Sequence, residues 1–102
     1  MFKAMILLKR RADKSRAEFT DWWLGQHRSL AEQLPGLQRA VFNLNTGDAA
    51  DDYDGVAELW FETQADFEAA YASEIGQRVA ADSMSNVSAR ERLLVDEFSI
   101  KG

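Results

Sequence analysis

The chain has 102 residues, of which 46% are hydrophobic and 11% aromatic, so it can build one hydrophobic core and is too apolar to be disordered. It has no cysteine, which excludes disulfides and thiolate chemistry and fits a cytoplasmic protein. A formal net charge of -5 argues against nucleic acid as a partner, because phosphates are bound by clustered Lys and Arg. We therefore expect a single domain over residues 1–102.

The first predicted element is a β-strand over residues 2–9, where side chains alternate between two largely apolar sides. The run is too short for a membrane span or the core of a signal peptide, so we expect no membrane association. Three basic residues follow, Lys9, Arg10 and Arg11. Such a cluster is typical of a solvated strand end, and an anion site is the less favoured alternative.

A helix is predicted after Ser15, because Ser15 and Glu18 have the spacing of a capping box. Residues at intervals of three and four then share one face of that helix: Phe19, Trp23, His27, Leu30 and Leu34. Pro35 and Gly36 are expected to end it.

Two strands should follow, over residues 37–46 and 55–62, joined by a solvated acidic turn over residues 47–54. A second helix is predicted from Thr63, since Phe67, Tyr71, Ile75 and Val79 recur every four residues, and it should fade around Ser83. Residues 83–89 read as a loop, and alternation over residues 93–100 predicts the last strand.

This order is typical of a ferredoxin-like βαββαβ domain of the α+β class, with a four-stranded antiparallel sheet and two helices on one face. The purely apolar side of each strand should face the helices: Ala4, Ile6, Leu8, Ala40, Phe42, Leu44, Ala57, Leu59, Phe61, Leu93 and Val95. The opposite face should carry Met5, Leu7, Val41, Val56, Trp60, Leu94 and Phe98. That is too much apolar surface for a monomer, so we expect a homodimer in which a second copy covers it.

Two blocks of sequence resemble the EthD family of the dimeric α+β barrel superfamily: HRSLAEQLPGLQRAVFN, from His27 to Asn43, and YDGVAELWFET, from Tyr53 to Thr63. Their spacing fits the family too, and weaker agreement at both ends extends the resemblance over nearly the whole chain. The family takes its name from a protein needed for bacterial degradation of an ether fuel additive. Relatives in the superfamily include lactone isomerases, polyketide cyclases and dehydratases, and cofactor-free monooxygenases, so the resemblance implies the fold and leaves the reaction open.

Many members of the family carry a tyrosine where this chain has Ala40, so an acid-base pair of that tyrosine with the histidine does not carry over. Haem, found in distant members of the superfamily, would need His27 as its axial ligand in a domain too small to bury a macrocycle easily. With one histidine and no cysteine, a metal would need several carboxylates, and the acidic turn lacks the pattern of a calcium loop. We therefore expect no cofactor and no metal.

His27 is the candidate catalytic residue, because it is the only side chain with an unperturbed pKa near neutrality and the family resemblance places it in a cleft between helix and sheet. A core histidine bonded to a backbone carbonyl is the structural alternative. The candidate substrate-binding residues are the aromatic side chains predicted to face the same space: Trp23, Phe42, Phe61, Phe67 and Tyr71. Core packing is the structural alternative for these as well.

Two functions from different classes follow. The first is a cofactor-independent isomerase, lyase or cyclase that acts on a small hydrophobic carbonyl compound or lactone, with His27 moving a proton beside the carbonyl. The second is a binding or carrier protein that holds a hydrophobic intermediate, accessory to a degradative oxidase, in which His27 supplies one hydrogen bond. A cofactor-free monooxygenase is the third and least favoured reading.

Overall fold

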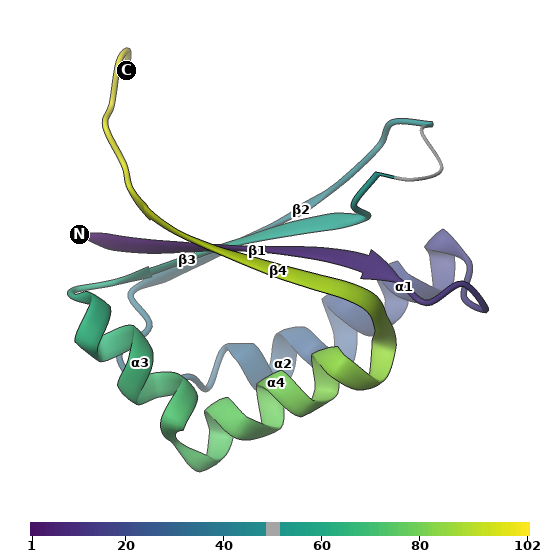
Figure 1. The fold of residues 1–102 in the computed structure, drawn as a ribbon, viewed down its shortest axis with the longest axis horizontal. Coiled ribbons are helices and arrows are strands. Elements are labelled where there is room, and N and C mark those ends of the chain that lie inside the picture. The colour runs from purple at the N-terminus through teal and green to yellow at the C-terminus, as the bar shows by residue number, and fades with distance from the viewer. Residues whose placement is uncertain (49–51) are drawn as a thin grey trace.

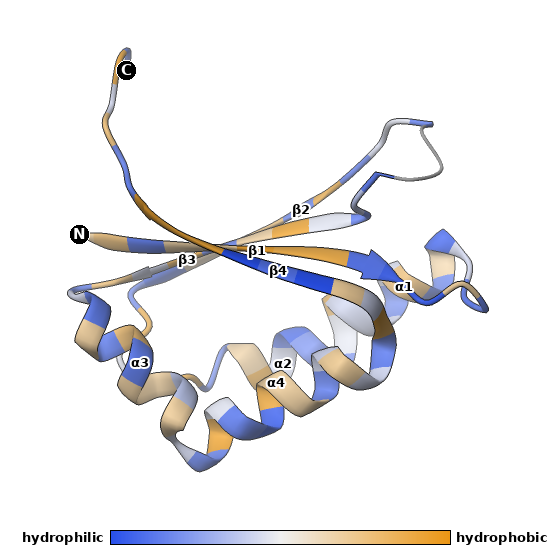
Figure 2. Cartoon of the chain, viewed as in Figure 1, coloured by the Kyte–Doolittle hydropathy of each residue, from blue (hydrophilic) through white to orange (hydrophobic). Residues whose placement is uncertain are grey.

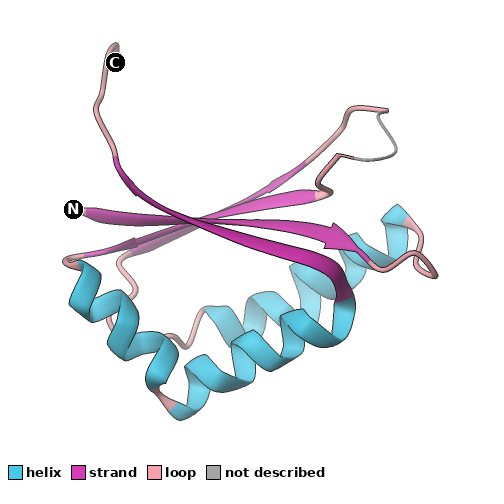
Figure 3. Ribbon diagram, in the orientation of Figure 1, coloured by secondary structure: helices cyan, strands magenta, loops and turns pink. Residues whose placement is uncertain are grey.

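The computed structural model describes residues 1–48 and 52–102 as one domain with a sheet on one side and helices on the other (Figure 1). Asp51, which the sequence assigns to the acidic turn, lies outside the described residues. The strands are β1 (Phe2–Arg10), β2 (Arg39–Leu44), β3 (Gly55–Phe61) and β4 (Val87–Asp96). All pairs are antiparallel in the order β2-β3-β1-β4, which confirms the predicted βαββαβ arrangement (Figure 3).

The first predicted helix is divided in three: α1 (Arg16–Trp22), the π-helical turn η1 (Trp23–His27) and α2 (Arg28–Ala31). It begins as the sequence predicts, since the Ser15 hydroxyl accepts from the Glu18 amide and the Glu18 carboxylate accepts from the Ser15 amide. The π turn was not predicted from the sequence. Such turns are rare and occur often at functional sites.

The second predicted helix is two helices, α3 (Gln64–Ala72) and α4 (Glu74–Asn86). Ser73 between them has an extended backbone, and its hydroxyl accepts from the Gly76 amide to cap α4. Gly76 packs tightly against the end of α3, where a Cβ would fall 2.5 Å from the Tyr71 Cα and closer still to the Ala70 carbonyl oxygen. The two helices therefore meet at a sharp corner that a larger residue would obstruct.

The C-terminal part of the prediction was wrong. Residues 83–86 continue α4 instead of forming a loop, and β4 begins at Val87 and ends at Asp96. Leu94 pairs with Ala4 and so belongs to the helix-facing row, whereas Leu93 pairs with Met5 on the opposite face. The predicted orientation of β4 is therefore reversed, because a shift of one residue exchanges the two faces of a strand.

Arg90 and Arg92 take the helix-facing positions of β4, opposite Leu8 and Ile6. Figure 2 shows this hydrophilic stretch in the middle of the strand. The two guanidinium groups lie over aromatic rings of α3, 5.9 Å from the centre of Tyr71 for Arg90 and 5.2 Å from that of Phe67 for Arg92. On the other three strands, the predicted helix-facing rows are confirmed by the register.

On the outer sheet face, Trp60 is only 7% exposed, so it does not form the open apolar patch that the sequence predicts. Lys3 and Arg39 lie over its ring at 4.7 and 4.5 Å, and its Nε1–H donates to Glu97 at 3.3 Å. Lys3 also pairs with Glu58 at 2.6 Å. Phe98, assigned to the same face, follows the end of β4 and is 79% exposed in a tail that leaves the domain (Figure 1).

The basic cluster at the end of β1 is largely paired. Arg10 donates from Nη1 and from its amide to the buried carboxylate of Asp54, at 2.7 and 2.8 Å. Arg11 forms an exposed ion pair with Asp13 at 2.8 Å. Asp54 was therefore wrongly read as part of a solvated turn, because it fastens the β2–β3 hairpin to β1.

Candidate functional site

His27 lies at the end of η1, on the side of the helical layer that faces the sheet, and is only 5% exposed. Trp23, at the start of the same turn, is fully buried and stacks on Phe42 of β2 with ring centres 4.4 Å apart. Gly55 of β3 makes room for that indole, since a Cβ there would be 2.5 Å from the Trp23 ring. Helix and sheet thus approach closely where the histidine is held.

The carboxylate of Asp82, on α4, is the centre of a network around His27. Its Oδ2 lies 2.9 Å from His27 Nδ1 and accepts from Trp22 Nε1 at 3.0 Å. Its Oδ1 accepts from Gln26 Nε2 at 2.8 Å. The side chains of His27 and Asp82 are 7% and 9% exposed. The pair joins the first helical segment to the last helix before β4.

This network sets the tautomer of His27, because an ionised carboxylate can only accept a hydrogen bond. Nδ1 therefore carries the proton, and Nε2 on the other side of the ring is an acceptor, with the Ser83 hydroxyl within hydrogen-bond distance at 3.4 Å. Burial lowers the pKa of His27 from its ordinary value of 6.5, and the hydrogen bond and charge of Asp82 partly oppose this. At physiological pH the His27 ring is thus neutral and held in one orientation.

His27 and Ser83, whose hydroxyl lies near Nε2, both line a small cavity between the sheet and the helices. Its wall is mostly apolar, with polar groups from His27, Tyr71, Ser83 and Arg90. The cavity has a volume of about 10 Å³, about the room of one water molecule. Burial raises the pKa of Tyr71 above its ordinary value of 10.0, which keeps the phenol protonated and able to donate a hydrogen bond.

A larger groove of about 350 Å³ adjoins this cavity at the β2 edge of the sheet. It is lined by Leu24, Arg28, Ala31, Glu32, Ala40 and Phe42. Ala31 and Phe42 belong to both walls. Phe42 therefore lies between the open groove and the enclosed cavity beside His27.

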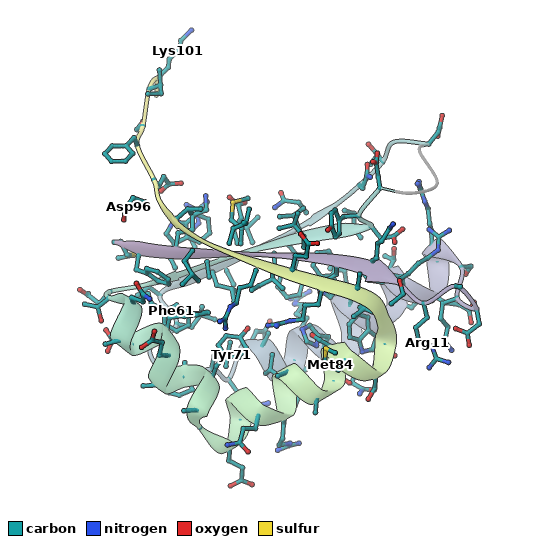
Figure 4. All side chains as sticks on the ribbon, in the orientation of Figure 1. Arg11, Phe61, Tyr71, Met84, Asp96 and Lys101 are labelled. Carbon is teal, nitrogen blue, oxygen red and sulfur yellow. The ribbon has the colours of Figure 1, made fainter. Side chains whose placement is uncertain are left out.

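Three of the five aromatic residues predicted to bind substrate line the cavity: Trp23, Phe42 and Tyr71. The structure places the other two, Phe61 and Phe67, in the closed core, where their rings pack edge to face at 5.6 Å. Figure 4 shows Phe61 and Tyr71 in the layer between sheet and helices. The assignment of His27 and these side chains to a site remains a prediction.

Sequence reasoning missed Asp82, Ser83 and Arg90. The four-residue spacing from Phe67 to Val79 continues to Ser83, and this signal was available in the sequence. Extending the helix by one turn would have placed Asp82 and Ser83 beside the face that carries Val79. Arg90 had no such signal, since a charged residue on a strand is normally assigned to solvent.

Within residues 1–48 and 52–102, no helix is long and apolar enough to cross a membrane. The same part of the chain contains no group of three or more His, Cys, Asp or Glu side chains arranged to hold a metal ion.

Comparison with known proteins agrees with this architecture. The chain matches no curated protein. Among solved structures, an EthD family protein from Bacillus halodurans superimposes with a TM-score of 0.82 at 17% identity, covering 96% of this chain and 100% of that one. A dimeric ferredoxin-like protein from Thermobifida fusca gives 0.72 at 16% identity, with 92% and 88% covered.

The hydroxynitrile lyase of Passiflora edulis gives a TM-score of 0.73 at 15% identity, with 96% of this chain and 95% of that chain covered. At such identities the likeness establishes the ferredoxin-like fold alone. The sequence itself matches the EthD domain over residues 11–88, which is most of its length and includes His27 and Asp82. The chain therefore belongs to the EthD family.

Proposed function

We propose that this protein is an enzyme that moves a proton beside the carbonyl group of a small hydrophobic substrate, as a cofactor-independent isomerase, lyase or cyclase does. The observation that carries the proposal is the buried pair of His27 and Asp82 at the wall of the cavity. A histidine that is oriented by a carboxylate, lines a cavity and has an unprotonated ring nitrogen has the arrangement of a general base.

In this proposal His27 Nε2 takes a proton from the carbon next to the carbonyl group. Burial favours the neutral imidazole before the reaction, and the Asp82 carboxylate stabilises the imidazolium that forms. The same nitrogen then returns the proton to a different atom of the substrate, which completes an isomerisation or an elimination. Tyr71 is placed to donate a hydrogen bond to a substrate oxygen in the cavity.

The size of the two spaces limits how a substrate can bind. The cavity holds about one water molecule, whereas the adjoining groove is at the lower end of the usual range of ligand sites. We infer that the apolar body of the ligand occupies the groove. Its reactive end then reaches the cavity when the Phe42 side chain moves off the Trp23 ring.

We also propose a homodimer formed through the outer sheet face. That face carries the half-buried apolar side chains of Met5, Leu7, Val41 and Val56, and Leu93 beside them is 51% exposed. The dimeric neighbour from Thermobifida fusca has the same fold, which supports this arrangement. Trp60, which the sequence assigned to this face, contributes less because its own chain buries it.

The test is exchange of α-protons for deuterium in a panel of small ketones and lactones, followed by NMR in D₂O. His27→Asn should keep the fold and slow exchange by about a hundredfold or more, the usual scale of a general base. Gln77→Ala, at an exposed position of α4, is the control that should exchange at the wild-type rate.

Two results would contradict the proposal. If the protein is a carrier, neither form catalyses exchange, and His27→Asn weakens ligand binding only about fivefold, the equivalent of one hydrogen bond of about 1 kcal/mol. If His27 is only structural, the variant loses stability by about 1–3 kcal/mol while its exchange rate per folded molecule is unchanged.

A further inference from the structure

Arg90 carries a half-buried positive charge that no carboxylate of the described residues neutralises. It points from β4 toward the helices, opposite Leu8, and lines the cavity next to His27. Its Nε is buried and has no hydrogen-bond partner within the part of the chain that the structure describes. Its guanidinium group lies over the face of Tyr71, 5.9 Å from the ring centre.

Several other arginine side chains have a carboxylate partner, which Arg90 lacks within the described residues. Arg10 binds Asp54 at 2.7 Å, Arg11 binds Asp13 at 2.8 Å and Arg28 binds Glu32 at 3.0 Å. A guanidinium group taken out of water costs free energy unless an anion compensates it. Arg90 lies at the wall of the candidate site beside Tyr71, and no carboxylate of the described residues offsets the free-energy cost of burying its charge.

A second buried donor of the same wall also lacks a partner. Trp23 is fully buried, and its Nε1–H donates no hydrogen bond within the described residues. Buried polar groups nearly always have partners, so each exception calls for a cause. Both unpartnered groups are donors, and both belong to residues around one cavity. What is missing from this wall is an acceptor, and beside a guanidinium the favoured acceptor is an anion.

We propose that Arg90 binds an anionic oxygen of the ligand, either the enolate oxygen formed from a carbonyl group or the oxygen of a carboxylate. This inference rests on the proposed function. When His27 Nε2 takes the α-proton, the C–H electron pair forms the new carbon–carbon double bond and the carbonyl π pair moves onto oxygen. The resulting negative oxygen lies against Arg90, and the proton returns from His27 to carbon, so no oxidant or reductant is needed.

The experiment measures binding of two probes by quenching of tryptophan fluorescence: pentane-2,4-dione, which forms an enolate, and hexanoate, which is a carboxylate. Arg90→Met should weaken binding of the probe that wild-type protein prefers by about 10- to 100-fold, and Arg90→Lys should restore part of the loss. Arg78→Met removes the same charge from an exposed position of α4 and should bind like wild type. Absorption of the enolate in the bound complex identifies the first source of the oxygen.

Stability gives a second readout that separates binding from a structural role. Arg90→Met should unfold at the same urea concentration as wild type or a higher one, because it removes an uncompensated charge. A structural residue would lower that midpoint. The proposal is overturned if wild-type protein binds neither probe, or if Arg90→Met binds both as wild type does.

The outcomes also distinguish this inference from the proposed function. If His27→Asn abolishes proton exchange while Arg90→Met retains wild-type exchange and binding, the base is correct and the anion site is wrong. If His27→Asn has no effect on exchange while Arg90→Met loses hexanoate, the anion site stands and the proposed reaction fails.

Discussion

Replacement of Asp82 by alanine is the most direct test of the network that orients His27. The change removes the acceptor of three hydrogen bonds, from His27, Trp22 and Gln26. The His27 Nδ1–H is left buried without a partner, which costs about 1–3 kcal/mol. Trp22 is half-buried and adds about 1 kcal/mol, whereas the exposed Gln26 can turn to water at little cost.

We therefore expect Asp82→Ala to lower the free energy of unfolding by about 2–4 kcal/mol, which for a domain of this length is a drop in melting temperature of roughly 10–30 °C. Urea denaturation followed by tryptophan fluorescence measures it. Asp82→Asn keeps one acceptor oxygen and should lose less. Asp21→Ala, which removes an exposed carboxylate from α1, should stay within about 0.5 kcal/mol of wild type.

A double-mutant cycle with His27→Ala would then isolate the pair. Because the two side chains are in direct contact, their coupling energy should be about 1–3 kcal/mol. The reasoning is refuted if Asp82→Ala is as stable as Asp21→Ala, or if the effects of Asp82→Ala and His27→Ala simply add.

Three further predictions concern pH, packing and assembly. Because burial lowers the pKa of His27, the unfolded chain binds a proton at higher pH than the folded chain does. The free energy of unfolding should therefore fall as pH drops below 6.5. Urea melts at about pH 5 and about pH 8 should show a smaller fall for His27→Asn than for wild type. Gly76→Ala should lower the free energy of unfolding by more than about 2 kcal/mol, since its Cβ would meet backbone atoms. Gly25 has open space around it, so in the same melts Gly25→Ala should leave that free energy unchanged or raise it by up to about 1 kcal/mol. Wild-type protein should sediment at about 23 kDa, twice the mass of the 11.5 kDa chain. Val56→Arg should dissociate the dimer, whereas the control Met84→Arg should not. A wild-type monomer at micromolar concentration would contradict the dimer.

The fold could be predicted from the sequence because strong local signals agreed with one another. The capping box at Ser15 and the period of two in β1 and β3 each specify an element and the face that it buries. β4 failed because Leu93, Leu94 and Val95 are consecutive apolar residues, so alternation alone cannot choose a face. The choice was made by pairing with β1, which is a contact between distant residues.

The candidate site could be predicted only in part for the same reason. His27 was found as the only histidine and Trp23 by helical spacing, both of which are local signals. Asp82 lies 55 residues from His27 along the chain, and the two side chains meet only when α4 packs against η1. No local pattern in the sequence indicates that contact.

The chain has a single histidine, and its ring lies at the wall of a cavity. His27 can therefore serve as a natural NMR probe of that cavity. The ring-proton signals of His27 can be observed in a simple NMR spectrum without resonance assignment, since no other histidine contributes to them. Nitrogen-15 shifts of the same ring distinguish a protonated Nδ1 from a protonated Nε2. One label in one residue thus reports the tautomer that Asp82 imposes, the pH at which it is lost and the arrival of a ligand.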